Sequence, residues 1–581
     1  MRKLIVSALA LMAAHALVSC KKKDAPPAAP PVATTGATGP VAPTGGGAAP
    51  VAMVPVASPA VAGDVLGSGA IGSIDELVTA IEPYLAAMGS SKLGGAAIKA
   101  QIGKWIGLET WEGIDGAKPM RVWLVNPKKF KPPFVVALPL VVGKKAAVKG
   151  WAMEEIAGHA VLARDAATIA AVKSMVTEQL GAPAAATGSK VAFGLAVPAL
   201  LEVYAPEIER LLGKLSRMVG GASGAAGGDT KKFLAWLGRG ALDVARQIAR
   251  ADVQVVADKD SARLQLRLTP LPGTALAQFL AAPKQAMPTS LSKVAGDVSV
   301  AAVVAYAPDA VKTLFDKIAA HMESMGAEKP GQFAAFFRDG IGALMSALKG
   351  DFVYVKRTTG NATTALMSVV DGPKGLEALR SFYVKAGALM QSDQSDVKSN
   401  LDLKKEAGAH KGTKFDRMRV TYDYSKLPEM HRKLLEQIQG KAMDSFLALK
   451  DGHLMLAGSN QTVDKPIQDA LDTLSAPAAG QTLADKAEFK ALLSQLPPSR
   501  FAVLYVSFVD YLKGALAGLA GMGGAGKLDA LKSEGFLGAS LASEGGALQV
   551  DAVATRSQIE SIRTLFGQMR GMGMGGPPPG P

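Results

Sequence analysis

The chain has 581 residues, of which 49% are hydrophobic and 20% are charged, and its formal net charge at pH 7 is +14. This length is sufficient for two or more packed domains. Cys20 is the single cysteine, which excludes intramolecular disulfide bonds and any metal site built from cysteines. The folded part must therefore be held together by its hydrophobic core.

The first 19 residues have the organisation of a secretory signal peptide. Met1–Lys3 is positively charged, Leu4–Val18 is apolar, and the small residue Ser19 precedes Cys20. The apolar stretch is too short to cross a hydrocarbon core of roughly 30 Å, but it suits the central region of a signal peptide. Its end, Leu17-Val18-Ser19-Cys20, resembles the lipobox of bacterial lipoproteins.

The lipoprotein resemblance implies that the thiol of Cys20 is acylated and that Cys20 becomes the first residue of the mature chain. Several acyl chains on one residue are sufficient for stable anchoring. The alternatives are an ordinary signal peptide that happens to contain a cysteine, or a buried free thiol. In the lipoprotein family, an aspartate directly after the cysteine retains the protein in the inner membrane. This chain has Lys21 at that position, so the resemblance favours a location in the outer membrane. We expect a lipid-anchored cell-envelope protein on either the periplasmic or the surface face.

Two segments have a low-complexity composition. Residues 20–63 begin with the lipidation site Cys20 and are rich in Ala, Pro, Gly, Val and Thr from Asp24 to about Ala62. Residues 571–581 contain only Gly, Met and Pro. Such compositions cannot bury enough side chain to offset the entropy of ordering. We expect a disordered linker that spans about 35 Å as a coil. The end of the chain is expected to be a disordered tail rather than a methionine metal site.

The body of the chain contains recurring patterns. A short apolar strand running into a helix, and an alternating strand turning into a helix, each occur about three times. In the second pattern Leu264, Leu266 and Leu268 predict one buried and one solvated face. A third pattern places Gly158-His159 and Gly452-His453 in equivalent hairpins. Copies of the first pattern occupy residues 191–201, 298–308 and 501–510, with a degenerate copy from residue 65, and copies of the second occupy 264–276, 364–374 and 548–557.

These patterns predict an α+β fold with two related halves, residues 64–285 and 296–570. Each half would be an antiparallel or mixed sheet with helices packed on one face, built from repeated β-α and ββα units. For any one of the short matches, chance is the alternative. The layout resembles a family of bacterial secreted proteins of unknown function in which such units repeat, and that resemblance implies no catalytic residues.

The histidines are the first candidates for a ligand site. His159 and His453 could bind a ligand at equivalent places, but histidine also suits the exposed tip of a turn, and we expect that simpler role. The remaining mature histidines, His321, His410 and His431, have no partner at metal-ligand spacing. We therefore expect no metal site.

A second candidate is a glycine motif. Gly67, Gly69 and Gly72 match the Gly-x-Gly-x-x-Gly pattern of dinucleotide-binding folds, in which glycines let a pyrophosphate approach a helix N-terminus. Here only two apolar residues precede the motif, which is too little for a buried strand. Ser73 and Glu76 predict an N-terminal capping box instead. We expect no dinucleotide and no other cofactor.

A third candidate is Ser290, which with Lys293 matches the Ser-x-x-Lys motif of penicillin-binding proteins. The segment between Pro288 and the following strand is too short for the buried helix that this chemistry requires. The companion motifs also deviate, since Ser392-Asp393-Gln394 replaces Ser-Asp-Asn and Lys411-Gly412-Thr413 inverts Lys-Thr-Gly. We therefore expect no catalytic residues.

Positive charge is the remaining signal. Loss of Arg2 and Lys3 with the signal peptide lowers the net charge from +14 to +12, because 14 − 2 = 12. This balance favours an anionic envelope lipid or glycan as partner, whereas nucleic acid is not expected outside the cell. The segment 231–250 predicts a basic amphipathic helix that could lie on a membrane but more simply packs on a sheet. The basic segment 128–133 predicts a loop joining two strands.

The leading hypothesis is a non-enzymatic, lipid-anchored envelope protein with a binding or scaffolding role. A carrier of a lipid or another hydrophobic ligand is the alternative, because helices backing a sheet can open an apolar groove. An envelope hydrolase is the third possibility, disfavoured because no nucleophile and base are paired in the sequence. The sequence does not indicate protein partners or an oligomeric state.

Overall fold

The computed structural model describes residues 64–87, 94–181, 191–204, 242–282, 287–313, 336–358, 362–390, 398–429, 440–459, 463–476, 480–517 and 533–571, with a few residues between these ranges. The predicted signal peptide, lipidation site and linker lie outside the described residues, as does the tail beyond residue 571. His321, His431 and Ser392–Gln394 lie outside them too. The predictions made for these parts stay predictions.

The strands form one sheet of eighteen members. In chain order they are β1 (Val65–Ile71), β2 (Met120–Val125), β3 (Phe134–Pro139), β4 (Ala152–Ile156), β5 (His159–Ala163), β6 (Val191–Ala196), β7 (Ile248–Ala257), β8 (Ser261–Pro270), β9 (Val298–Ala305), β10 (Leu348–Arg357), β11 (Thr363–Val369), β12 (Lys398–His410), β13 (Thr413–Asp423), β14 (Ala442–Lys450), β15 (His453–Ser459), β16 (Arg500–Val506), β17 (Leu537–Glu544) and β18 (Ala547–Thr555).

Helices occupy many of the connections between the strands. They are α2 (Ile74–Ala87), α3 (Gly95–Trp105), α4 (Ala166–Gly181), α7 (Ala275–Ala281), α10 (Gly342–Ala347), α11 (Gly372–Met390), α13 (Lys465–Ser475), α14 (Ala487–Gln495), α15 (Phe508–Ala517) and α17 (Arg556–Gly571), with a 3₁₀ turn η1 (Thr289–Lys293) and a π-helical turn η2 (Phe336–Ile341). Within the described ranges, none of these helices is long and apolar enough to cross a membrane.

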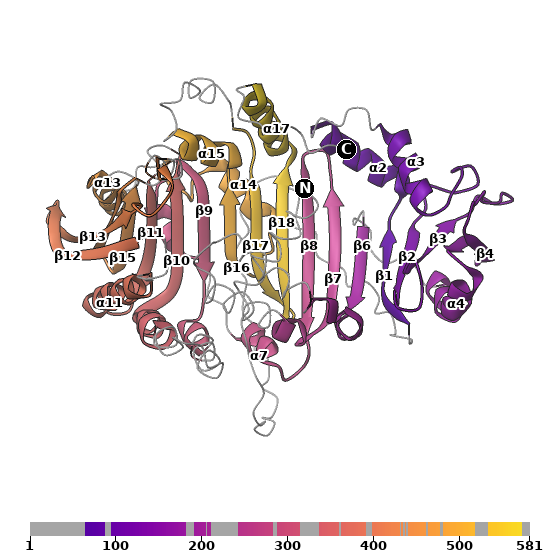
Figure 1. Cartoon of the computed structure of the whole chain (residues 1–581), viewed down its shortest axis with the longest axis horizontal. Coiled ribbons are helices and arrows are strands. Elements are labelled where there is room, and N and C mark those ends of the chain that lie inside the picture. The colour runs from indigo at the N-terminus through magenta and orange to yellow at the C-terminus, as the bar shows by residue number, and fades with distance from the viewer. Residues whose placement is uncertain are drawn as a thin grey trace.

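All strand pairs are antiparallel, and they place the strands in the order β4-β5-β3-β2-β1-β6-β7-β8-β18-β17-β16-β9-β10-β11-β15-β14-β13-β12. Figure 1 shows these strands side by side across the length of the molecule. At about 4.8 Å per strand, the sheet measures about 80 Å between its edge strands β4 and β12. The expected α+β class and antiparallel pairing are confirmed, but one sheet runs through the whole body instead of one sheet for each half.

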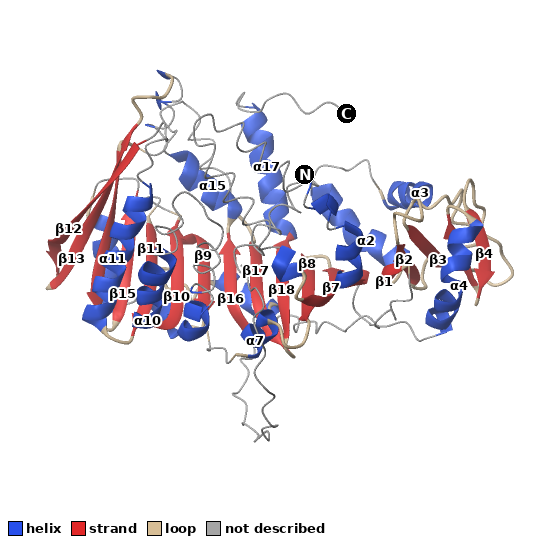
Figure 2. Cartoon of the chain, turned by 60° about the horizontal axis from the view of Figure 1, so that its bottom comes forward, coloured by secondary structure: helices blue, strands red, loops and turns tan. Residues whose placement is uncertain are grey.

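Helices cover both faces of this sheet (Figure 2). Leu366 and Met367 are neighbours in β11 and therefore point to opposite faces. Leu366 is buried in a cluster with Leu471 of α13, whereas Met367 is buried with Leu344 of α10 and Leu379 of α11. The expectation of helices on one face is therefore wrong. Strands that are apolar on both sides need a cover on both sides.

The first part of the body is covered in the same way. Val161 and Leu162 are neighbours in β5, and the former packs with Trp123 and with Val172 of α4. Leu162 instead belongs to a cluster with Ile74 of α2. Both faces are therefore closed by helices at this end of the sheet as well.

The predicted cap fixes where α2 begins. The Ser73 hydroxyl oxygen accepts a hydrogen bond from the backbone N–H of Glu76 at 3.1 Å, and the Ser73 hydroxyl donates to the carbonyl oxygen of Gly116 at 2.9 Å. The first contact satisfies one of the N–H groups that a helix start leaves without an intrahelical partner. The second ties the cap to the loop that precedes β2.

Candidate functional site

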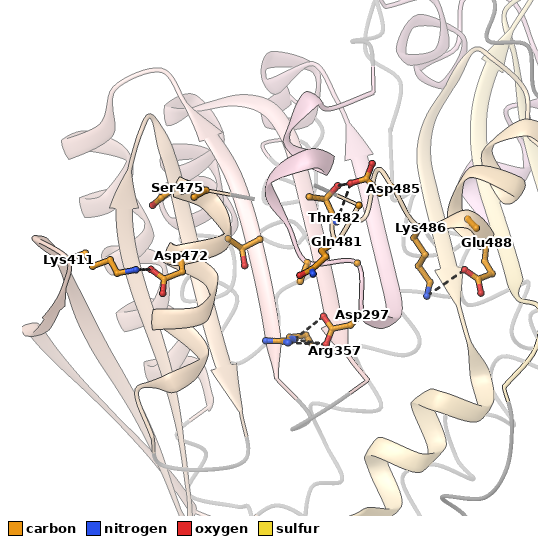
Figure 3. Close-up of a pocket in the computed structure, with 16 residues that line it drawn as sticks. Asp297, Arg357, Lys411, Asp472, Ser475, Gln481, Thr482, Asp485, Lys486 and Glu488 are labelled. Carbon is orange, nitrogen blue, oxygen red and sulfur yellow. Dashed lines mark hydrogen bonds and ion pairs between the residues drawn. The ribbon is translucent and has the colours of Figure 1, made fainter. Parts of the chain in front are cut away.

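A polar cleft of about 870 Å³ opens where α13 and α14 meet the ends of β9 and β10 (Figure 3). Four segments that are distant in the sequence supply its walls: the entry to β9, the end of β10, the β12–β13 turn, and the chain from the last turn of α13 to the first turn of α14. The lining residues with charged side chains are Asp297, Arg357, Lys411, Asp472, Asp485, Lys486 and Glu488.

The cations of the cleft are bound to carboxylates. Arg357 donates from Nε to both carboxylate oxygens of Asp297, at 3.1 and 3.0 Å, and from Nη2 to Oδ2 at 2.9 Å. Its Nη1 donates to Asp469 at 3.3 Å. Lys411 Nζ donates to Asp472 Oδ1 at 2.8 Å, and Figure 3 shows this pair and the Arg357–Asp297 pair. The positive charge of the cleft is thus compensated within the chain.

Hydrogen bonding also fixes the carboxylates in their ionised form. The Lys411 ammonium, followed by His410, lowers the pKa of Asp472 below its ordinary value. Hydrogen bonds from Thr482, whose hydroxyl lies 2.6 Å from Oδ2, lower the pKa of Asp485. A carboxylate with a lowered pKa is a poor proton donor at neutral pH, so neither residue suits general acid catalysis.

The charges of the cleft nearly cancel. Three cations and four carboxylates line it, which gives 3 − 4 = −1. This is not the anion-binding surface that the net charge of the chain predicts. Sequence reasoning missed the cleft, because Asp297 and Asp469 lie 60 and 112 residues from Arg357 and no local pattern connects them.

His159 and His453 occupy equivalent turns, as the repeat predicts. Each begins a strand after a two-residue turn with left-handed backbone, Ala157-Gly158 in one case and Asp451-Gly452 in the other. The Nδ1 atom of His159 lies 2.9 Å from the carbonyl oxygen of Ala157, and that of His453 lies 2.7 Å from the carbonyl oxygen of Asp451. Both imidazoles thus contact the backbone of their own turns, and each is half-buried at the start of its strand.

Ser290 lies in the short 3₁₀ turn η1 and is buried. Its hydroxyl donates to Oδ2 of Asp351 at 3.4 Å, an atom that also accepts the Ser368 hydroxyl at 2.7 Å. Lys411, the start of the inverted companion motif, belongs to the β12–β13 turn and binds Asp472. The structure therefore gives Ser290 an aspartate partner and a structural contact instead of the serine–lysine pair of the motif.

The glycine motif runs through strand β1. Residues 65–71 form this strand, so the expectation that no buried strand accompanies the motif is wrong. A side chain at Gly69 would lie 2.3 Å from the ring of Phe193 and 2.5 Å from the carbonyl oxygen of Ala192, both on the paired strand β6. The glycines of β1 therefore make room for the neighbouring strand, and Gly72 follows β1 before the helix cap.

A buried polar cluster joins β8 to β18 in the middle of the sheet. Gln265 Nε2 donates to Oδ1 of Asp551 at 2.8 Å, and Gln549 Nε2 donates to Oδ2 at 3.0 Å. Gln265 and Asp551 are fully buried, so the solvated face predicted for the strand of Leu264 is wrong. Burial raises the pKa of Asp551 above its ordinary value.

The two basic segments have different outcomes. Most of segment 231–250 lies outside the described residues, but its end does not continue as a helix, because Ile248–Arg250 begins strand β7. There Arg250 binds the buried carboxylate of Asp252, with Nη2 and Oδ1 2.7 Å apart. Segment 128–133 joins β2 to β3 as expected, and Lys129 binds Asp64 at 2.8 Å.

No group of three or more His, Cys, Asp or Glu residues in the described ranges is arranged to hold a metal ion. No protein-family model matches the chain, and neither the curated proteins nor the solved structures contain a significant match.

Proposed function

We propose that the chain is a lipid-anchored protein of the bacterial cell envelope that acts as a non-catalytic scaffold or binding protein. Cys20 is the proposed site of acylation, residues 20–63 form the linker, and the outer membrane is the proposed location. The observation that carries the scaffold role is the single open sheet, about 80 Å long between its edges. Such a body can hold partners apart at a membrane without containing a reactive centre.

We also propose that the body consists of two related halves, residues 64–285 and 296–570. The strand pairs support this interpretation, because β1 pairs with β2 and β6 as β9 pairs with β10 and β16. The pairs β2–β3, β3–β5, β4–β5, β6–β7 and β7–β8 correspond in the same way to β10–β11, β11–β15, β14–β15, β16–β17 and β17–β18. In this correspondence β12 and β13 are an insertion.

The polar cleft favours a scaffold over a carrier or a hydrolase. Its cations bind carboxylates of the same chain, whereas a carrier of a hydrophobic ligand needs an apolar cavity. A hydrolase needs a nucleophile hydrogen-bonded to a base. Ser290, the candidate nucleophile, donates to Asp351, which also accepts from Ser368.

Metabolic labelling with a radiolabelled fatty acid tests the anchor. The wild-type chain should incorporate the label, and Cys20→Ala should lose all of it while accumulating as unprocessed precursor. Label in the Cys20→Ala chain, or none in the wild type, would contradict the proposal. Native mass spectrometry of the acylated chain then separates the roles, because a scaffold should show only the covalent acyl mass and a carrier an additional lipid.

A further inference from the structure

Two loops meet at the β4 end of the sheet. One follows α3 and covers residues 106–118, and the other connects β3 to β4 and covers residues 140–151. They are joined by backbone hydrogen bonds, which makes them one unit that we call the β3–β4 tip. These bonds run from Lys149 N to Gly107 O at 2.8 Å, from Glu109 N to Ala147 O at 2.9 Å, and from Val141 N to Gly113 O at 2.9 Å.

Large apolar side chains are exposed on and beside this tip. Val142 is 95% exposed, Val141 37%, and Trp105, which ends α3 directly before the first loop, 57%. Met153, on the adjoining edge strand β4, is also exposed. Of the seven large hydrophobic residues exposed in the described part of the chain, four lie between residues 105 and 153. This concentration distinguishes the tip from the remainder of the described surface.

Lysines flank the apolar side chains in the sequence. Lys104 precedes Trp105, and the exposed residues Lys144, Lys145 and Lys149 follow Val142. The exposed carboxylates of these loops belong to Glu109 and Glu112, and Glu112 lies 3.5 Å from Lys144. Lys118 is also exposed in the first loop, but it pairs with Asp115 at 3.0 Å. The other three exposed lysines of the loops, together with the adjacent Lys104, give 4 − 2 = +2 charges against the two glutamates.

We propose that the β3–β4 tip docks on an anionic lipid membrane, with Val142 and Trp105 entering the headgroup region and the lysines binding lipid phosphates. Tryptophan prefers the interface between headgroups and hydrocarbon, where its ring is apolar and its N–H stays solvated. Lysine side chains extend their apolar stems along the same surface and keep the ammonium groups among the headgroups. A protruding turn with an almost fully exposed valine and flanking lysines has the chemistry of such an interface.

The inference rests on the proposed function, because lipidation is what would bring the tip to a membrane. Two valines, one tryptophan and a few lysines bind a bilayer only weakly by themselves. A linked anchor turns the docking step into an intramolecular event at high effective concentration. Docking of the tip would then hold the long sheet in one orientation to the membrane.

A fluorescent label at Val142→Cys tests the docking. If Cys20 is acylated, its thiol is blocked, so a thiol-reactive, polarity-sensitive dye attaches at position 142 alone. The acylated chain is placed in phosphatidylcholine vesicles with or without roughly 30% phosphatidylglycerol. We expect a blue shift and a several-fold rise in emission in the anionic vesicles. The matched control is Val370→Cys. Val370 is 68% exposed and directly follows β11, and a label there should show neither change.

Two further variants test the electrostatic part. Lys144→Gln and Lys145→Gln should each lower the ratio of docked to undocked chains about fivefold, as expected for one lysine at an anionic surface. Equal responses at positions 142 and 370, or no response at 142, would overturn the docking proposal.

Failure of the anchor has a different signature. Dye attached to the wild-type chain would mark Cys20 as an unmodified thiol and refute the lipidation. Docking is then measured on Val142→Cys in the Cys20→Ser background, with an N-terminal His tag that holds the chain on a nickel-chelating lipid in the same vesicles and so replaces the anchor. A silent label on this tethered chain refutes docking independently.

Discussion

Replacement of Arg380 by methionine should weaken the attachment of the β12–β13 hairpin to α11. Arg380 donates from Nε and Nη2 to the two oxygens of Asp416, at 2.6 and 2.9 Å. Asp416 is 2% exposed and also accepts the backbone N–H of Glu406 at 2.9 Å, where β12 is bulged. Removal of the guanidinium would leave a buried carboxylate with only this neutral donor.

The expected cost is about 3 kcal/mol, at the lower end of the range of about 3–5 kcal/mol for breaking a buried ion pair. The lower end applies because Arg380 is partly exposed and the N–H of Glu406 stays bound. The double variant Arg380→Met/Asp416→Asn should recover about half of this loss, because the residual group is then neutral. Asparagine keeps an acceptor for the N–H of Glu406.

Urea unfolding combined with hydrogen exchange of the β12–β13 amides measures the effect. Lys374→Met is the matched control on the same helix, since Lys374 binds Asp371 at 3.1 Å with its side chain 83% exposed. An exposed pair of this kind contributes less than about 1 kcal/mol. If Arg380→Met costs no more than Lys374→Met, the assignment of a stabilising role to the buried pair is wrong.

Two further predictions concern packing and pH. Gly296→Ala should cost about 1–3 kcal/mol in urea unfolding, because its Cβ would lie 2.5 Å from the carbonyl oxygen of Thr482, whereas Gly567→Ala in α17 has no atom within 4 Å and should be neutral or stabilising. Burial raises the pKa of Asp551 in the folded chain. In the unfolded chain this carboxyl group loses its proton above about pH 4, whereas in the folded chain it keeps the proton to a higher pH. Stability of the wild type should therefore fall, relative to Asp551→Asn, as pH rises from about 4 to neutrality. A difference between the two unfolding midpoints that does not depend on pH would contradict this assignment.

Several local features could be predicted from the sequence. The apolar segments that start at Val191, Val298 and Phe501 contribute strands β6, β9 and β16, and the Gly-His pairs at His159 and His453 form matching turns. These features depend on the alternation of side chains along a strand and on the backbone conformation that glycine permits. Both are properties of neighbouring residues, so they are visible in a single chain.

The environment of each strand face could not be predicted from the sequence, and the reason is physical. Alternation of Leu264, Leu266 and Leu268 indicates a strand, but it does not tell whether the opposite face meets water or another layer. In the structure, the face of β8 opposite these leucines carries Gln265. This side chain is fully buried and donates a hydrogen bond to the fully buried Asp551 of the neighbouring strand β18. A polar side chain with a buried partner has the same sequence pattern as one in solvent.

The sequence by itself determined the absence of disulfide bonds, the α+β class, and the positions of many strands and turns. Only the tertiary structure decided that β8 pairs with β18, which joins Gln265 to a partner 286 residues away, and that helices close both faces. Backbone N–H and C=O groups are the same in every strand, so local sequence cannot select a strand's neighbours. That choice depends on the burial of the whole set of apolar faces, which exists only once the chain has folded.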